Sequence, residues 1–572
     1  MTKILLMNIP SALFPTDYPL VAISRVIESI DPSLNCEVSF LNLDYYRMTF
    51  EEIKSRIQSF SPQIIGFSAI LTPTYVYVKK LSNFIKEHYP GIIQVLGGEM
   101  TVMANIILTK TGIDFCCIGE SEPTFSNLIR RLQQEDFKIT NMQNYTDIKG
   151  LVFRLNGTSH FTGYEEKYTE NSLKQFNYKL ISQFTDIDHY FQKLPGQHFR
   201  MRISADKMQN FVAQLYPHNR NKRMATVFAS KGCVSRCTFC SRFLKGYRVN
   251  EVDSVINYIE NLKKDFDVGM ILFSEENFGS SIKSTAKLVE YLKNSGLNWA
   301  ATAIRAKTLT KEAVKDWREA GCVHILAGLE SASQKILEVM EKRTTVQDNL
   351  DFLRNCHKNR IFTAVGMVIG MPGETEETIQ ESIDNFATVL SDNIRMPFEM
   401  YVNYVQAIPG TPIYEYARRC GLIGNSLEGE EKYIESLYDI NANEIDHYLN
   451  FTDYEKEEVA YWQPYIRLEL LAAYIKRHGY INVLKYNKSK KFRYALIYIL
   501  FPKLLRRILL KYLIIVRYYG IIGLVQCIYK ALLRQRTKRF EHINISVRKL
   551  NKEIPLFVRE DDLSTAILRE GR

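Results

Sequence analysis

Apolar runs and amphipathic stretches alternate along the first 135 residues of the chain. Five short apolar runs predict β-strands, at residues 3–9, 36–43, 63–70, 92–98 and 114–120. The stretches between and after them have apolar residues at helical spacing, which predicts helices at 22–30, 50–60, 75–88, 103–109 and 122–133. Strands that alternate with helices of this length are typical of a parallel sheet with helices on both faces. Such a sheet binds ligands at the carboxyl ends of its strands.

A second alternating series begins at Arg223. Its apolar runs predict six strands, at 225–230, 269–274, 298–304, 323–330, 362–370 and 399–407, each followed by a loop or helix. Six consecutive βα units favour a partial (β/α)6 barrel, whose site lies at the carboxyl ends of its strands. We therefore expect four regions: an α/β sheet domain at 1–135, a linker with a hairpin at 136–222, the partial barrel at 223–430, and a helical, basic region at 431–572.

The overall composition is that of a globular protein. The chain has 572 residues, of which 46% are hydrophobic and 24% charged, which excludes a disordered or fibrous chain. Its N-terminus lacks the layout of a signal peptide, and no run of about 18 apolar residues predicts a membrane span. Ten cysteines in such a chain indicate reduced thiols and a cytoplasmic location.

The net charge of +11 comes from one segment. Between Lys485 and Phe540 there are fifteen Lys or Arg and no Asp or Glu, which leaves 59 basic and 63 acidic residues elsewhere. The basic residues of 503–517 fall on one helical arc of roughly 140°. This pattern is typical of an interfacial helix, so one hypothesis is peripheral contact with the inner face of a membrane through 485–540. The helix could instead pack on the protein with a solvated basic face, whereas the lack of an RNA-binding motif disfavours nucleic acid.

Three of the ten cysteines form a cluster in the loop after the first barrel strand. Cys233, Cys237 and Cys240 are spaced so that three thiolates of one loop can hold an iron–sulfur cluster. Three ligands for a 4Fe-4S cluster leave one iron open to a substrate. Structural zinc requires a fourth ligand, which does not follow at a suitable spacing. The remaining alternative is three buried structural cysteines.

The cysteine spacing in this βα series resembles that of the radical S-adenosylmethionine (SAM) superfamily. Further motifs follow in the order of that family's barrel, including FSEENF at 273–278 and AGLES at 327–331. GMVIGMPGET at 366–375 and AIPGTPIYEYA at 407–417 are similar to elements of its cobalamin-dependent branch. The resemblance implies that Cys233, Cys237 and Cys240 hold the cluster and that SAM is contacted by Phe239, Glu275, Glu276, Arg305, Glu330 and Ser331.

In this branch the domain before the barrel is a doubly wound, flavodoxin-like sheet that binds cobalamin. IIGFSAILTPTY at 64–75, VLGGE at 95–99 and IGESE at 118–122 resemble its three cofactor loops. The resemblance implies cobalamin contacts from Ser68, Thr72, Gly97, Gly98, Glu99, Gly119, Glu120 and Glu122. The chain has no DxHxxG motif and no His before His88, so a domain His cannot coordinate cobalt in the usual position.

The resemblance implies a radical enzyme. Reductive cleavage of SAM at the cluster yields a radical that abstracts hydrogen, and in methyltransferases of this branch cobalamin then supplies a methyl group. The leading hypothesis is methylation of an unactivated carbon of a small-molecule or lipid substrate, with an electron donor such as flavodoxin or ferredoxin. One alternative is a cobalamin-dependent radical cyclase or ring-rearranging enzyme. Another is a non-catalytic cobalamin- or redox-binding protein with a structural cluster. No motif identifies a catalytic acid or base.

Overall fold

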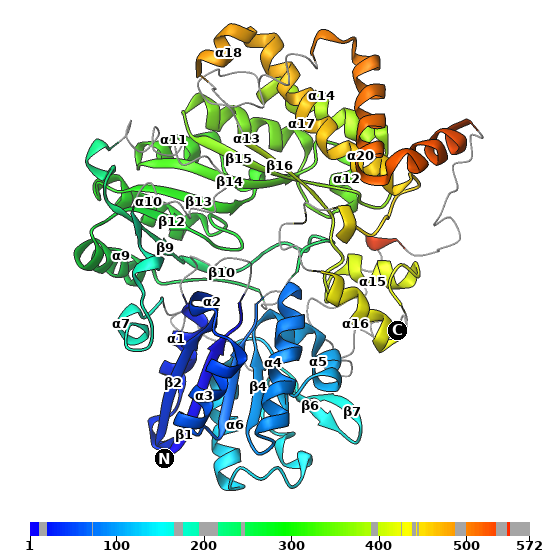
Figure 1. The fold of residues 1–572 in the computed structure, drawn as a ribbon. Coiled ribbons are helices and arrows are strands. Elements are labelled where there is room, and N and C mark those ends of the chain that lie inside the picture. The colour runs from blue at the N-terminus through cyan, green and yellow to red at the C-terminus, as the bar shows by residue number, and fades with distance from the viewer. Residues whose placement is uncertain are drawn as a thin grey trace.

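A computed structural model of the whole chain gives its fold (Figure 1). The structure describes residues 1–10, 20–70, 72–164, 175–193, 216–241, 246–390, 399–424, 426–437, 442, 445–486, 499–532 and 546–548. The described part of the 485–540 segment is therefore 485–486 and 499–532. Two sheets and a group of C-terminal helices make up the molecule, and the predicted α/β fold class is confirmed.

The N-terminal sheet has seven strands in the order β2-β1-β3-β4-β5-β6-β7. Its five parallel strands are β1 (Thr2–Asn8), β2 (Cys36–Asn42), β3 (Ile64–Ser68), β4 (Ile93–Gly97) and β5 (Phe115–Cys117). The helices that connect or follow these strands include α1 (Val21–Ser29), α3 (Phe50–Phe60), α4 (Tyr75–His88), α5 (Ala104–Lys110) and α6 (Ser121–Gln134). All five strands bury apolar side chains, as expected for a sheet covered on both faces.

The hairpin expected between the two α/β regions belongs to this first sheet. Strands β6 (Leu151–Leu155) and β7 (Thr158–Phe161) form it, and β6 pairs antiparallel with β5. The N-terminal unit therefore extends to the hairpin. The hydrophobic pattern alone predicts the hairpin but not the strand with which it pairs.

The second sheet has the order β16-β15-β14-β13-β12-β9-β8. Six strands are parallel: β9 (Arg223–Val227), β12 (Val268–Phe273), β13 (Asn298–Ile304), β14 (Cys322–Glu330), β15 (Phe362–Ile369) and β16 (Glu399–Tyr404). The helices that follow them are α9 (Val252–Phe266), α10 (Ile282–Asn294), α11 (Lys311–Glu319), α12 (Gln334–Val339), α13 (Val346–Lys358), α14 (Glu376–Leu390) and α15 (Pro412–Arg419). The short β8 (Gln192–Lys193) adds an antiparallel edge to this partial barrel.

Helices form the C-terminal region. They are α16 (Leu427–Ser436), α17 (Lys456–His478), α18 (Tyr480–Tyr486) and α20 (Lys503–Leu532), which bends at Gly520. In Figure 1, α17 and α20 lie beside the barrel helix α14, whereas α15 and α16 lie beside α4 and α5 of the first sheet. None of the described helices is both long and apolar enough to pass through a bilayer.

Three of the five basic residues predicted to share one face of residues 503–517 pair with acids of the protein, whereas Lys503 and Arg517 are exposed. Arg506 pairs with Glu469 at 3.3 Å, Lys511 pairs with Glu458 at 2.6 Å, and Arg507 pairs with Glu376. The helix therefore packs on the protein, and the solvated basic face expected with that alternative is confined to Lys503 and Arg517. The basic face is the one that meets α14 and α17.

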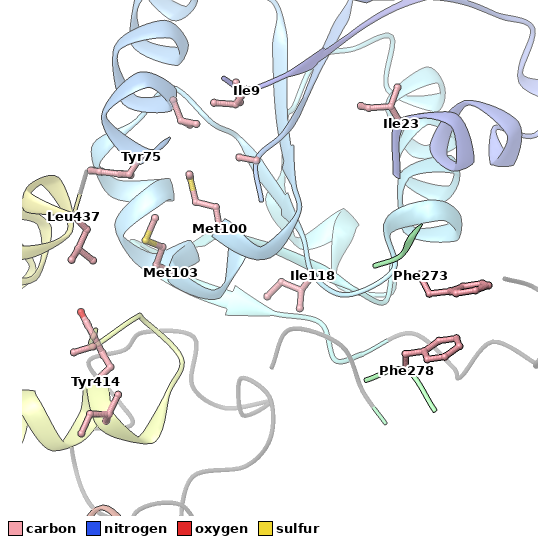
Figure 2. Packing of buried hydrophobic residues seen from close by; sticks show 14 of the residues in the cluster. Ile9, Ile23, Tyr75, Met100, Met103, Ile118, Phe273, Phe278, Tyr414 and Leu437 are labelled. Atoms are coloured by element: carbon pink, nitrogen blue, oxygen red, sulfur yellow. The ribbon is translucent and has the colours of Figure 1, made fainter. Parts of the chain in front are cut away.

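One apolar core connects the three parts. The cluster of buried side chains runs from Ile4 to Val547 without a break between the two sheets. Figure 2 shows a section of it with Ile118 from the first sheet, Phe273 from the barrel and Tyr414 from α15. A shared core fixes the relative positions of the two sheets, and with them the positions of the two predicted cofactor sites.

Candidate functional site

The cysteine loop follows β9 through a short antiparallel pair, β10 (Ser230–Gly232) and β11 (Tyr247–Val249). Gly232 has φ +81°, and a side chain there would collide with the carbonyl of Gly246, so the close pairing needs glycine. Cys233 follows at once and is half-buried, Cys237 is buried, and Cys240 is exposed. The Cys233 sulfur accepts a hydrogen bond from the Ser235 N–H at 3.4 Å.

Thr238 holds this loop in place from its centre. Its N–H donates to the Met340 carbonyl at 3.0 Å, and its hydroxyl donates to the Val339 carbonyl at 3.0 Å. Its own carbonyl accepts the Ile413 N–H from the start of α15, also at 3.0 Å. Because Thr238 is fully buried, these three bonds fix the loop between Cys237 and Cys240 against two helices.

A buried ion pair lies next to the loop. Glu330 ends β14 with φ +64°, a left-handed conformation that is rare for a residue with a side chain. Its carboxylate pairs with Lys342 at 2.9 Å, and the Arg305 guanidinium donates to the Lys342 carbonyl at 2.7 Å. Although burial opposes its charge, Glu330 holds the pKa of Lys342 above its ordinary value. The charges of all three side chains act on Cys237.

Glu275 and Glu276 lie at the base of the same loop. The Glu275 carboxylate accepts hydrogen bonds from the Ala229 N–H and the Ser230 hydroxyl. Burial raises the pKa of Glu275 to about 7, against the effect of these bonds. Glu276 accepts the Gly232 N–H. Both acids therefore support the strand that leads to Cys233.

The two remaining residues predicted to contact SAM differ in their surroundings. Phe239 lies in the loop and packs against the main core with part of its ring exposed. Ser331 is fully buried, and its hydroxyl lies 3.2 Å from that of Ser382 on α14. The structure thus brings Arg305 and Glu330 towards Cys237, whereas the Ser331 hydroxyl is engaged behind the strand end.

The three thiols suit an iron–sulfur cluster better than a single ion. Among the described residues, no three His, Cys, Asp or Glu side chains are close enough to share one metal ion. A four-iron cluster is larger than one ion, and three thiols of one loop are a donor set that fits it. Burial raises the pKa of the Cys237 thiol, which Lys342 and Arg305 oppose. Bound iron would add positive charge that favours the thiolate form.

A cavity of about 220 Å³ opens at the carboxyl ends of the N-terminal strands. Seven of the eight residues predicted for cobalamin line it: Ser68, Gly97, Gly98, Glu99, Gly119, Glu120 and Glu122. The eighth, Thr72, is not among the lining residues and is buried at the start of a short 3-10 turn. Nothing lies within 4 Å of the position that a side chain on Gly119 would take, so such a side chain would occupy the cavity. No His is among the described lining residues.

Cations surround the acids of this cavity. Arg25 of α1 is buried and pairs with Glu120 at 3.3 Å and with Glu122 at 2.8 Å. Glu120 also pairs with Lys231 at 2.8 Å and with Arg248 at 2.5 Å, both from the β10–β11 pair of the barrel. Although burial opposes it, these cations hold the pKa of Glu120 below its ordinary value. Glu120 thus joins the two sheets.

Glu99 lines the N-terminal cavity and is coupled by charge to the region of the cysteine loop. It follows Gly98, which has φ +97°. A side chain added at that position would collide with the Ala69 carbonyl. Desolvation, with a further contribution from the charge of Glu276, raises the pKa of Glu99 to about 7. The charge of Glu276, at the base of the cysteine loop, therefore affects the protonation of Glu99 in the N-terminal loops.

Sequence reasoning missed Lys342, Arg25 and Lys231. Lys342 follows α12, twelve positions after its partner, where no local motif marks it. Arg25 lies within an amphipathic helix and resembles an ordinary surface residue until the fold places it against Glu120. The sequence marks Lys231 only by its position two residues before Cys233. The structure shows that Lys231 lines the N-terminal cavity.

Comparison with protein families matches both sheet domains. The B12 binding domain family matches residues 15–129, and the Radical SAM superfamily matches residues 227–386. The chain therefore carries a B12 binding domain and a Radical SAM domain together. A radical SAM domain implies a 4Fe-4S cluster with SAM, and a B12 binding domain implies cobalamin, as the resemblance of the motifs indicated.

Relatives of this two-domain chain include cyclases and methyltransferases. It is 26% identical over 344 residues to the anaerobic magnesium-protoporphyrin IX monomethyl ester cyclase of Cereibacter sphaeroides, which covers 59% of this chain and 51% of that protein. The match therefore spans about half the length of the cyclase. It is also 26% identical over 454 residues to an uncharacterized methyltransferase of Pyrococcus horikoshii, covering 76% of this chain and 85% of that protein.

Solved structures share the fold. The cobalamin-dependent SAM radical enzyme OxsB, with aqua-cobalamin and SAM bound, superimposes with a TM-score of 0.59 and 16% identity, over 96% of this chain and 78% of OxsB. The radical SAM methyltransferase TsrM from Kitasatospora setae gives a TM-score of 0.54 and 17% identity, over 74% of this chain and 77% of TsrM. At this level of identity, the likeness establishes a common fold.

Proposed function

We propose that this protein is a cobalamin-dependent radical SAM methyltransferase that methylates an unactivated carbon. The position of Lys231 is the main support. This residue lines the glycine-rich cavity and lies two positions before Cys233, so the cavity reaches the start of the cysteine loop. A substrate radical formed at the cluster site can take a methyl group from cobalamin only if the two cofactor sites are adjacent.

The cysteine loop is the proposed site for the cluster and SAM. Cys233, Cys237 and Cys240 are the proposed cluster ligands. Lys342 presents a buried cation close to Cys237, which suits the carboxylate of SAM. We assign Glu330 and Arg305 to holding Lys342 in this position, Phe239 to the adenine, and Glu275, Glu276 and Ser331 to shaping the site. When bound, the cluster and SAM supply the hydrogen-abstracting radical and cobalamin supplies the methyl group.

The N-terminal cavity is the proposed site for cobalamin. Gly97, Gly98 and Gly119 allow a large ligand to approach the backbone closely. The first turn of α6 begins beside Gly119, so its free N–H groups suit a phosphate of the nucleotide tail. The buried Arg25 and the partly exposed Lys231 add positive charge at the same place.

The proposed partners follow from the chemistry. The substrate is a small molecule or a lipid, and a low-potential electron donor such as flavodoxin or ferredoxin reduces the cluster. We propose a cytoplasmic enzyme that works at the inner surface of a membrane, where an apolar substrate would be available.

Release of 5′-deoxyadenosine tests the radical reaction. Anaerobically reconstituted protein with SAM and dithionite is expected to form it, and Cys237→Ala is expected to abolish both its formation and the cluster absorbance. Cys36→Ala is the matched control, because Cys36 is a half-buried cysteine of β2, remote from the loop. A fully loaded wild-type protein that forms no 5′-deoxyadenosine would instead indicate a non-catalytic binding protein.

A radical cyclase is the second candidate. The similarity to anaerobic magnesium-protoporphyrin IX monomethyl ester cyclases, at 26% identity, favours it. Both candidates form 5′-deoxyadenosine, so they differ in the fate of the SAM methyl group. Only the methyltransferase is expected to pass that group to cobalamin.

A further inference from the structure

Helix α20 presents its charged side to the protein and its apolar side outward. The ion pairs of Arg506, Arg507 and Lys511 with acids of α14 and α17 occupy the inner side. Ile515, on the same side, is fully buried. Leu510 and Ile514 also pack against the main core, so ion pairs and apolar contacts together hold the inner side of the helix.

The outer face of α20, as we call it, is aliphatic along its length. Before the bend it consists of Leu504, Leu505, Ile508, Leu509, Tyr512 and Leu513, at spacings of one and four that keep them on one side. Leu504 and Leu513 are 70% and 66% exposed. After the bend, Ile521 and Ile522 are 72% and 76% exposed. A contiguous apolar surface of this kind on a folded chain marks a site of protein or membrane contact.

Basic residues flank this face along the chain. Five Lys or Arg lie in 485–493 and five more in 530–539, and no Asp or Glu occurs anywhere from 485 to 540. We propose that α20 docks its outer face into the surface of an anionic lipid bilayer. The aliphatic side chains would enter the acyl boundary, and the positive charge of the adjoining sequence would favour anionic head groups.

The composition favours lipid over a protein partner. The outer face is dominated by Leu, Ile and Val, whereas the residues that dominate protein interfaces are Trp, Tyr and Arg, with Leu and Val under-represented. The net positive charge of the sequence before and after this face complements anionic lipids and disfavours the approach of a second copy with the same charge. A bilayer surface also accepts the apolar residues on both sides of the bend at Gly520 without a shaped pocket.

The contact is separate from the catalytic chemistry. The ion-pair partners of α20 that the structure describes are on α14, α17 and their neighbours, and none is a proposed cofactor residue. Lipid binding and methyl transfer can therefore fail independently. The location refines the proposed function by identifying the face that meets the membrane.

Flotation with vesicles tests the proposal on the full chain. Vesicles of phosphatidylcholine with phosphatidylglycerol are compared with vesicles of phosphatidylcholine alone. The wild type is expected to float with the anionic vesicles, and Leu513→Glu to lower the partition coefficient at least tenfold. Ile282→Glu is the matched control, because Ile282 at the start of α10 is 76% exposed but remote from α20, and it should leave binding unchanged.

Thermal melting of each variant confirms folding, since both positions are exposed and neither substitution should lower the melting temperature. Equal flotation of the wild type and Leu513→Glu would overturn the proposal, as would equal recovery with and without vesicles. A lipid-free dimer in light scattering that Leu513→Glu converts to monomer would instead identify the outer face as an interface between copies, and would also overturn it.

Discussion

At the residue scale, Glu330 combines a left-handed backbone conformation with an ion pair to Lys342 that is largely shielded from solvent. Glu330 has a left-handed conformation that costs energy, and its charge lies beside a buried thiol. Natural structures retain such strain where the surroundings hold it for a function. Here Lys342 and Arg305 provide the contacts that hold it.

Loss of Lys342 should therefore be costly. Lys342→Met would leave the Glu330 carboxylate buried without its partner, and we expect the free energy of unfolding to fall by about 3 kcal/mol. Lys342→Arg should retain most of the stability. Urea denaturation measures the difference, and the double variant with Glu330→Gln should recover part of the loss. An additive double variant would contradict the coupling.

The pH dependence of stability should report on Glu275. Its pKa is about 7 in the folded chain against an ordinary value of 4.5, so the folded state keeps a proton that the unfolded state has lost. The stability from this group is thus present below about pH 4.5 and declines as the pH rises to 7. In Glu275→Gln, urea denaturation from pH 4.5 to 8 should show a shallower decline, by at most about 3 kcal/mol. Parallel curves for the two proteins would argue against a raised pKa.

The cysteines could be predicted from their spacing, but the roles of their neighbours could not. A motif records which residues are adjacent in sequence, whereas Lys342 and Arg25 acquire their meaning from partners on other elements. Ser331 shows the converse. Its place in a motif predicts a contact, while the fold sets its hydroxyl against Ser382.

At the element scale, α15 and α16 tie the cysteine loop to the N-terminal sheet. The start of α15 donates a hydrogen bond to Thr238. Glu431 of α16 accepts hydrogen bonds from Tyr75 at 2.6 Å and Lys79 at 2.7 Å, both on α4. These helices thus connect the proposed cluster loop with the domain that would hold cobalamin.

A less stable α15 should hold the cysteine loop less firmly. Thr411 caps α15 by accepting the Tyr414 N–H, and Thr411→Ala should cost about 1 kcal/mol of stability. We also expect iron to be lost to a chelator several times faster, as followed by cluster absorbance. Thr310→Ala removes the equivalent cap of α11, outside this connection, and should cost similar stability without faster iron loss. The same chelation rate in both variants would refute the coupling.

The periodicity of the strands predicted their positions well, because a buried parallel strand is a short apolar run with a helix after it. Helix α20 shows what the periodicity of a sequence cannot predict. A helical wheel places the basic residues on one arc but does not show what that arc faces. The acids that bind it, such as Glu376 and Glu458, lie in other helices.

At the scale of the whole molecule, Glu120 joins the two sheets through Lys231 and Arg248. Glu120→Gln would remove the carboxylate that Arg25, Lys231 and Arg248 share, so we expect the unfolding free energy to fall by about 2–4 kcal/mol at pH 7. Because its pKa is lowered, this contribution should be present above the ordinary carboxylate range and disappear on acidification. Asp147→Asn breaks an exposed pair with Arg131 and should change stability by less than about 1 kcal/mol. Equal effects in urea denaturation would mean that Glu120 does not join the sheets.

The central claim is that a methyl group passes between two adjacent cofactors. Fully reconstituted protein is incubated anaerobically with SAM carrying a deuterated methyl group, and mass spectrometry follows the label in the cobalamin fraction together with S-adenosylhomocysteine. The account predicts labelled cobalamin and a matching amount of S-adenosylhomocysteine in the wild type and in Cys36→Ala. Protein that binds both cofactors and forms 5′-deoxyadenosine, yet leaves cobalamin unlabelled, would contradict it.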